Sequence, residues 1–217
     1  MRSIQEEVRT EATDRVPSTF DPTDVRIAGI DQGFESDAVV GAVVVWHDGS
    51  IIEEVTARVP LHYPYVSGYL AFREAPAIVA ALETLSSEPD VLLFDGNGRL
   101  HPREAGLASH VGVVMDVPSI GVAKNLLCGE LVDPPSEPFP VGTEIPIKSD
   151  GRLLGYAVQT RQWDTPGQSI NPVYVSPGHK MDAATAVTIV TGSTRGYKLP
   201  EPIRLADKLA AQATGTG

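Results

Sequence analysis

Runs of apolar, largely β-branched residues near the start of the chain are separated by short polar turns. The first run, residues 26–30, ends in Asp31; the second covers 38–46 and the third 51–59. Between the last two runs stands His-Asp-Gly-Ser at 47–50, a combination typical of a tight turn. Because short turns join antiparallel neighbours, the pattern predicts a three-stranded antiparallel meander.

Farther along, the apolar spacing changes to that of helices alternating with short strands. In 73–85, apolar residues recur at helical spacing and so share one face. Helices are predicted at 73–85, 106–115, 182–191 and 203–211, and strands at 91–94, 118–123, 153–160 and 173–175. A meander followed by alternating helices and buried strands predicts a mixed α/β sheet with helices on both faces.

The length of 217 residues suits one domain with a short appendage. Residues 1–24 are polar and charged, and we expect them to form a peripheral N-terminal arm that includes a short helix. Residues 25–217 are expected to form the single domain, with the Pro-rich segment 130–150 as a loop within it.

The sequence also indicates a compartment. The single cysteine, Cys128, excludes an intrachain disulfide and suits a reducing cytoplasm, where we expect it to be a small buried residue rather than a nucleophile. No apolar run has the length of a membrane span, and the first fifteen residues lack the apolar core of a secretory signal. We therefore expect a cytoplasmic protein with no membrane partner.

The chain carries 28 acidic and 17 basic residues, a net charge of −11. This sign does not suit a general nucleic-acid binder, because neutralising phosphates requires Lys and Arg. Two explanations stay open. The acids form a solvated surface, or some of them belong to a site whose carboxylates hold a metal ion.

Two acids directly follow predicted buried strands. Asp31 ends the first apolar run, and Asp95 ends the run Val-Leu-Leu-Phe. Carboxylates at such positions lose solvation unless a cation compensates them, and hard oxygen ligands suit Mg²⁺. If the two strands are neighbours, both carboxylates can bind one metal ion, and Glu74 near a helix start could complete the shell. The alternative is that Asp31 and Asp95 are turn residues, as the Asp-Gly dipeptide at 95–96 permits.

Three further segments offer groups for a phosphate, a base or a proton. Gly96 and Gly98 allow close backbone approach, and Lys124 after a buried strand could neutralise a phosphate. Ser-Pro-Gly punctuation before the helix at 182–191 predicts an exposed loop that projects His179 for proton transfer or a weak metal contact. The plainer alternatives are a tight glycine turn, an exposed lysine and a solvent-exposed histidine beside a helix cap.

A short loop adds an aromatic group to this set. Pro64 restricts the backbone, so that Tyr65 can be held out from the surface. Glu74 follows on the next helix. This combination suggests that a planar group is bound next to a charged reactive site.

These residues lie in blocks that resemble the endonuclease V family from about Arg26 to Ala206. The matching blocks are AGID (28–31), PYVSGYLAFREAP (64–76), PDVLLFDGNG (89–98), HPR (101–103), GLASH (106–110), IGVAK (120–124), VSPGH (175–179) and LPEPIR (199–204). Several long blocks in family order make the match specific.

The resemblance implies an RNase H-like fold. It also implies Mg²⁺-dependent cleavage of the second phosphodiester bond 3′ to deoxyinosine in DNA, with Mn²⁺ able to replace Mg²⁺. We expect deoxyinosine-containing DNA as the partner and a monomer as the working form. Two alternatives are an endonuclease acting mainly on inosine in RNA and a catalytically silent nucleic-acid-binding protein.

The resemblance also implies residue roles. Asp31, Glu74 and Asp95 match the metal-binding acids, and His179 matches the active-site histidine. The groups expected to contact nucleic acid are the wedge aromatic Tyr65 with Pro64, the glycine turn of Gly96 and Gly98 at the base edge, and the auxiliary residues His101 and Lys124. In two places the chain departs from the family pattern: Ser67 replaces the second proline of the wedge, and Gln32-Gly33-Phe34 follows Asp31.

The acidic surface leads to a prediction about salt. Lysine is scarce, with five against twelve arginines, a composition that would suit a high-salt cytoplasm. Since the Debye length falls from about 10 Å at 0.1 M salt to about 3 Å at 1 M, salt should screen the repulsion among surface acids. We expect the melting temperature to fall by about 5 °C or more when KCl is lowered from about 2 M to about 0.1 M. A melting temperature that does not respond to salt would contradict this.

Overall fold

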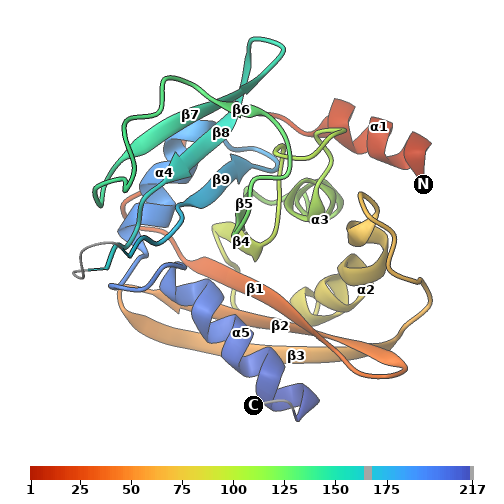
Figure 1. The fold of residues 1–217 in the computed structure, drawn as a ribbon. Helices are drawn as coiled ribbons and strands as arrows, with labels where there is room; N and C mark the ends of the chain where they lie inside the picture. The colour runs from red at the N-terminus through yellow and green to blue at the C-terminus, as the bar shows by residue number, and fades with distance from the viewer. Residues whose placement is uncertain (164–167, 216–217) are drawn as a thin grey trace.

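In a computed structural model, which describes residues 1–163 and 168–215, the chain forms one nine-stranded sheet with helices around it (Figure 1). The strand order is β3-β2-β1-β4-β5-β9-β8-β7-β6. The strands are β1 (Ile27–Phe34), β2 (Ala38–His47), β3 (Ser50–Pro60), β4 (Val91–Asp95), β5 (Ser119–Ala123), β6 (Glu130–Leu131), β7 (Glu144–Ser149), β8 (Arg152–Val158) and β9 (Val173–Pro177). The helices are α1 (Arg2–Glu11), α2 (Leu70–Leu82), α3 (Leu107–Met115), α4 (Ala183–Gly192) and α5 (Glu201–Thr214).

The first three strands form the predicted meander, since β1 pairs with β2 and β2 with β3, both antiparallel. β1, β4 and β5 are parallel neighbours. On the other side of β5, the strands β9, β8, β7 and β6 continue the sheet in antiparallel pairs. The predicted mixed α/β sheet is therefore confirmed.

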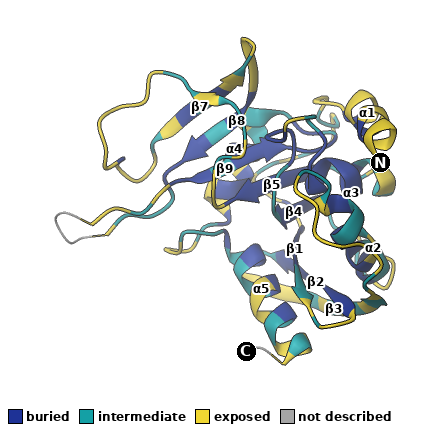
Figure 2. Ribbon diagram, turned by 45° about the vertical axis from the view of Figure 1, so that its right-hand side comes forward, coloured by how far each residue is buried: buried dark blue, intermediate teal, exposed yellow. Residues whose placement is uncertain are grey.

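Helices cover both faces of the sheet, as predicted. On one face α4 and α5 bury a core that includes Ile27 and Leu93; on the other, α2 and α3 bury one that includes Ile30 and Phe94. The central strands are accordingly buried along almost their whole length (Figure 2). No helix among the described residues is both long and apolar enough to cross a membrane.

Two strand glycines allow helices to lie close against the sheet. A Cβ on Gly29 would lie 2.2 Å from the backbone of Pro202 in α5, and a Cβ on Gly41 would lie 2.4 Å from the carbonyl oxygen of Ala77 in α2. Both distances are far inside van der Waals contact, so neither position accepts a side chain unless the helix moves. Because residues 29 and 31 share one face of β1, α5 also passes over Asp31.

The segment 130–150 was wrongly expected to be only a loop, since it contains β6 and β7. Ile145 and Ile147 of β7 point into a small core beneath the hairpin. The Pro-rich composition hid this strand. The carbonyl of Pro146 accepts a hydrogen bond from the Val132 N–H on the outer side of β7. The nitrogen of Pro146 faces the same side, where the pairing with β6 ends, so β7 loses no strand hydrogen bond there.

The expected N-terminal arm contains α1, which lies beside α3. Gln5 of α1 is completely buried, and its Nε2 donates a hydrogen bond to the Gly68 carbonyl at 2.9 Å. Just after the helix, Arg99 Nη2 donates to the Ala12 carbonyl at 3.0 Å. The arm is thereby attached to the loop that precedes α2 and to the loop that follows β4.

Candidate active site

Asp31 and Asp95 lie side by side at the end of two parallel strands. Ile30 of β1 is in register with Phe94 of β4, so the next residue of each strand is an aspartate on the face covered by α5. Asp31 is only 7% exposed. Burial first, and then the negative charge of Asp95, raise the pKa of Asp31 to about 7.

Glu74 reaches the aspartates from the helix on the opposite face. α2 begins at Leu70, three residues earlier than predicted, so Glu74 lies in its second turn. The side chain is almost completely buried. Burial, followed by the charge of Asp31, raises the pKa of Glu74 to about 8, although Arg73 opposes the shift. The structure thus brings together all three acids expected from the sequence.

A fourth acid, Asp207 of α5, was missed in the sequence. Its side chain shares a hydrogen bond with Asp31, and both this bond and its charge raise the pKa of Asp31. The cause lies in the packing of α5, which contacts Gly29 near its start and Gly33 near its end. Asp207, between these contacts, comes to lie over Asp31. The only feature of the sequence that pointed to Asp207 was its position as an acid on the helix predicted at 203–211.

Lys124 provides a positive charge inside the cluster. It follows β5, the parallel neighbour of β4, and its Nζ lies 2.6 Å from Asp95 Oδ2. Burial lowers the pKa of Lys124, but the hydrogen bond and charge of Asp95 outweigh this, so that the pKa is raised overall. Lys124 therefore faces Asp95, Asp31 and Asp207, and Arg73 lies near Glu74, so the site holds more acidic than basic groups.

The donor set fits a hydrated Mg²⁺ ion better than a closed protein cage. Among the described residues, no three acidic, histidine or cysteine side chains converge closely enough to hold a metal ion by themselves. One visible reason is that Asp95 is bonded to Lys124. Mg²⁺ commonly takes one or two protein carboxylates and completes its shell with water and substrate phosphate. The buried, all-oxygen donors and their surplus charge match that requirement.

A cavity of about 220 Å³ opens directly beside the acids. Its wall includes Glu74, Asp95 and Gly96, and the Tyr65 loop forms part of its rim. Tyr65 is 69% exposed, so the ring projects from the surface as expected for a wedge. The aromatic loop, the cavity and the acid cluster therefore form one continuous site.

Three side chains hold the end of the Tyr65 loop in place through the carbonyl of Gly68. Gln5 Nε2 donates to it at 2.9 Å, His101 Nε2 lies 3.2 Å away, and Arg103 Nη2 also donates. Since His101 Nδ1 accepts from the Arg103 backbone N–H, its Nε2 carries the proton. Burial, and then the charge of Arg103, lower the pKa of His101 to about 4. His101 is thus a neutral positioning residue in the cavity wall.

The two glycines of the expected base-contacting turn differ in role. Gly96 lines the cavity. Gly98 is buried beneath β9, where its N–H donates to Ser176 Oγ at 3.0 Å and a Cβ would lie 2.3 Å from the Pro177 carbonyl oxygen. The expected contact of Gly98 with nucleic acid is therefore corrected: this glycine allows the loop to pack against the sheet.

His179 does not lie with the acids, and the expectation of an exposed, projecting imidazole is wrong. Ser119 N–H, at the start of β5, donates to the His179 carbonyl, whereas Asp95 pairs with Val122 near the end of β5. Three residues of strand correspond to about 10 Å. The pairing of β9 with β5 carries the histidine inward, where it is 5% exposed and its Nε2 lies 3.2 Å from Asp116 Oδ1. His179 therefore supports the end of α3.

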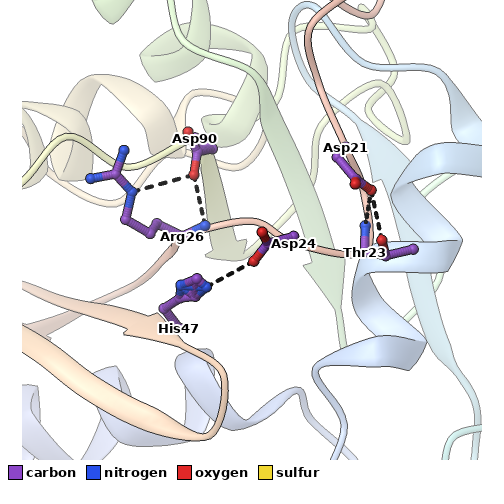
Figure 3. A network of polar contacts seen from close by, with 6 residues as sticks. All are labelled: Asp21, Thr23, Asp24, Arg26, His47 and Asp90. Carbon is purple, nitrogen blue, oxygen red and sulfur yellow. Dashed lines mark hydrogen bonds and ion pairs between the residues drawn. The ribbon is translucent and has the colours of Figure 1, made fainter.

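A second hollow, of about 320 Å³, lies near the start of β1, away from the acids. Two polar groups near it already have partners: His47 Nε2 lies 3.0 Å from Asp24 Oδ1, and the Arg26 N–H donates to Asp90 at 2.8 Å (Figure 3). These contacts fix the entry of the chain into β1. The hollow is therefore best explained as part of the scaffold.

Known proteins resemble this chain over most of its length. The family model described as Endonuclease V matches residues 5–208. An endonuclease V of Haloarcula marismortui is 49% identical over 98% of this chain and 79% of that protein. The crystal structure of endonuclease V from Streptomyces avermitilis has a TM-score of 0.86 at 36% identity, and covers 99% of this chain and 91% of that one.

A further solved structure contains nucleic acid. Endonuclease V of Ciona intestinalis, in complex with a 24mer DNA containing an inosine followed by a ribo-adenosine, has a TM-score of 0.82 at 32% identity. The match covers 99% of this chain and 96% of that one. With nearly the whole chain matched by the family model and by a relative of high identity, the resemblance seen in the sequence is confirmed: the chain belongs to the endonuclease V family.

Proposed function

We propose that this chain is a Mg²⁺-dependent endonuclease that cleaves the second phosphodiester bond 3′ to deoxyinosine in DNA. The observation that carries the proposal is the acid cluster in which the buried Asp31 and Glu74 meet the half-buried Asp95 and the exposed Asp207, beside a cavity beneath an exposed aromatic loop. The inosine-containing DNA held by the Ciona intestinalis relative supports the choice of substrate.

Asp31 and Asp95 would hold the metal, with Glu74 and Asp207 completing the acidic environment. A bound Mg²⁺ ion would neutralise charge on the phosphate and lower the pKa of a water molecule; Mn²⁺ could take its place. The family membership and the all-carboxylate donor set support this assignment.

The side chains of the site supply proton transfer and charge. Without a metal ion, the pKa values of Asp31, about 7, and of Glu74, about 8, place proton uptake near neutral pH. Because Asp31 would hold the metal as a carboxylate, Glu74 is the side chain suited to accept a proton from attacking water. Lys124, beside Asp95, can pair with a phosphate oxygen in the charged transition state.

The cavity and the Tyr65 loop would handle the base. At about 220 Å³ the cavity is smaller than the roughly 300–1,000 Å³ of drug-sized sites, which suits one planar base turned out of the helix. Tyr65 would stack in the place that the base leaves. Ser67, in place of the second wedge proline, makes this loop depend more on the three hydrogen bonds to Gly68.

Two other functions are separated by simple assays. An enzyme acting mainly on inosine in RNA would cleave a ribo-inosine strand faster than the matching deoxyinosine strand. A silent nucleic-acid-binding protein would bind both strands and cleave neither. The buried acid cluster favours catalysis, because its unfavourable desolvation serves no purpose in a surface that only binds.

The acid cluster gives the first test of this function. We expect Asp95→Asn to lower kcat/KM for a deoxyinosine duplex in Mg²⁺ by about 100-fold or more, because the change removes a metal-binding charge. The matched control is Asp150→Asn, since Asp150 is an exposed turn residue with a φ of 49° that asparagine also tolerates. Equal activity of the Asp95 variant and wild type would refute the mechanism.

A second pair of variants tests whether Asp207, and not His179, takes part in catalysis. We expect Asp207→Asn to lower kcat by about tenfold or more, because Asp207 hydrogen-bonds to Asp31. His179→Gln should leave kcat within about twofold in the fraction that folds, since His179 lies away from the acids. Both are measured as single-turnover rates with saturating enzyme. A large loss of rate in the His179 variant alone would restore the histidine to the mechanism.

The raised pKa values predict how stability depends on pH without metal. Asp31 and Glu74 keep protons in the folded state that the unfolded chain has already released, so stability should fall as pH rises through about 7 to 8. Between pH 7 and 9 we expect a loss of about 2 kcal/mol in urea unfolding with EDTA, most of it from Glu74. His101 and His110, with pKa values lowered to about 4, do not titrate in this range.

Two variations complete this measurement. Mg²⁺ should reduce the loss, because it stabilises the ionised carboxylates. Glu74→Gln should flatten the pH profile, since one of the two titrating groups is gone. Stability in EDTA that rises between pH 7 and 9 would show that the acids are not protonated as the structure indicates.

A further inference from the structure

An exposed aromatic ring and two cations lie in segments at the same edge of the sheet as the acid cluster. Trp163 is 48% exposed, and the guanidinium carbon of Arg161 lies 5.2 Å from the centre of its ring. Among the described residues, neither Arg161 nor Lys198 forms an ion pair. In a chain with a net charge of −11, unpaired cations beside an exposed tryptophan indicate a binding surface for an anion with flat groups.

The topology places this surface at the catalytic edge of the sheet. Ala123, just before Lys124, pairs with Tyr174 of β9, and Val158 at the end of β8 pairs with Val173. The loop between β8 and β9, which carries Arg161 and Trp163, therefore leaves the sheet beside Lys124. Figure 2 shows the two arms of this loop projecting away from the body of the protein.

Hydrogen bonds fix the base of the loop. The fully buried Gln159 donates through Nε2 to the carbonyls of Arg161 and Ile170, on the two arms, at 2.5 and 2.8 Å. Thr160 Oγ1 donates to the Lys198 carbonyl at 2.6 Å, which ties the loop to the segment before α5. Arg161 and Lys198 are thus held close to one another by the backbone.

Lys198 connects the surface to the acid cluster. Burial and the positive charge of Lys124 lower the pKa of Lys198, so the two lysines lie within electrostatic reach of each other. Two of the five lysines of the chain are therefore within electrostatic reach of each other at this edge. Neighbouring like charges are unfavourable alone and become favourable when an anion such as a phosphate lies between them.

The cavity and the Trp163 surface lie on opposite sides of the acids. The cavity takes walls from the starts of α2 and α3, whereas Lys198 precedes α5 on the other face of the sheet. A strand with its base in the cavity must cross Asp95 and Lys124 to reach Lys198. If the base is inosine and the cut falls on its 3′ side, as in the proposed function, the strand beyond the acids is the 3′ flank.

We propose that Lys198, Arg161 and Trp163 bind the nucleotides on the 3′ side of the scissile phosphate. Lys198 and Arg161 pair with successive phosphates, and Trp163 stacks on a base. Since a base in a duplex has its faces covered by its neighbours, the surface favours substrates that are unpaired on the 3′ side. This proposal rests on the proposed function for the direction of the strand.

The test compares deoxyinosine strands that carry two or ten unpaired nucleotides on the 3′ side. We expect Trp163→Ala to lower kcat/KM about tenfold on the long substrate, as for the loss of one stacked base, and to change it less than twofold on the short one. Trp163→Phe should retain most of the activity, because a phenyl ring also stacks. Equal effects on both substrates, or no effect on either, would overturn the proposal.

Matched control variants remove an exposed cation or an exposed apolar side chain elsewhere on the protein. Lys148→Ala removes an exposed cation from β7, for comparison with Lys198→Ala, and Ile52→Ala removes an exposed apolar group from β3. Both controls should leave the preference for the long 3′ flank unchanged. A control variant that loses this preference as strongly as Trp163→Ala would show a nonspecific cause and would overturn the proposal.

A binding measurement separates this inference from the proposed function. The chain has two tryptophans, and Trp46 is buried, so quenching by a strand in EDTA that is present in wild type and absent in Trp163→Phe reports Trp163. Such quenching without any cleavage of inosine strands in Mg²⁺ would refute the proposed function but support the surface. Cleavage by wild type without such quenching would refute the surface alone.

Discussion

The arrangement of this chain depends on holding four carboxylates together at the end of two parallel strands. Asp31 and Asp95 come from the strands, and Glu74 and Asp207 come from helices on opposite faces of the sheet. Burial and mutual repulsion raise the pKa values of Asp31 and Glu74 toward neutrality, a state that no stabilising role explains. The cluster persists because apolar strands buried on both faces fix the positions of its members.

Close backbone packing is the means by which the scaffold brings the acids together. Without side chains at Gly29 and Gly33, α5 lies directly on β1 and carries Asp207 to Asp31. On the other side of the site, the carbonyl of Gly68 gathers hydrogen bonds from Gln5, His101 and Arg103, although α1 and the loop after β4 are far apart in sequence. The aromatic loop is therefore positioned by the same packed framework as the acids.

The part of the site that could be predicted from the sequence is the part encoded locally. Asp31 and Asp95 each end an apolar strand, and parallel neighbours bring strand ends together, so their meeting followed from the pattern. Asp207 depends on where a helix crosses a strand, which no local spacing records. His179 shows the converse: Ser-Pro-Gly-His is typical of an exposed loop, but pairing of β9 with β5 buries it. Similarly, Pro146 kept β7 from being predicted as a strand. Its nitrogen, which carries no hydrogen, faces outward, where no further strand needs a hydrogen bond from it.

The charge distribution resolves the apparent conflict between an acidic chain and a polyanionic substrate. Several arginines are neutralised by acids at the surface, as in the pair of Arg58 with Glu35, so they add little attraction at long range. Lys124, by contrast, is hydrogen-bonded to Asp95 within the acid cluster, and Lys198 lies within electrostatic reach of Lys124. Without a cation, the carboxylates would repel a phosphate. If a divalent ion binds as proposed, it would remove that repulsion, and metal and nucleic acid would then each strengthen the binding of the other. Because the acidic surface repels nucleic acid elsewhere on the protein, binding of a nucleic acid would then depend on the site with its metal ion in place.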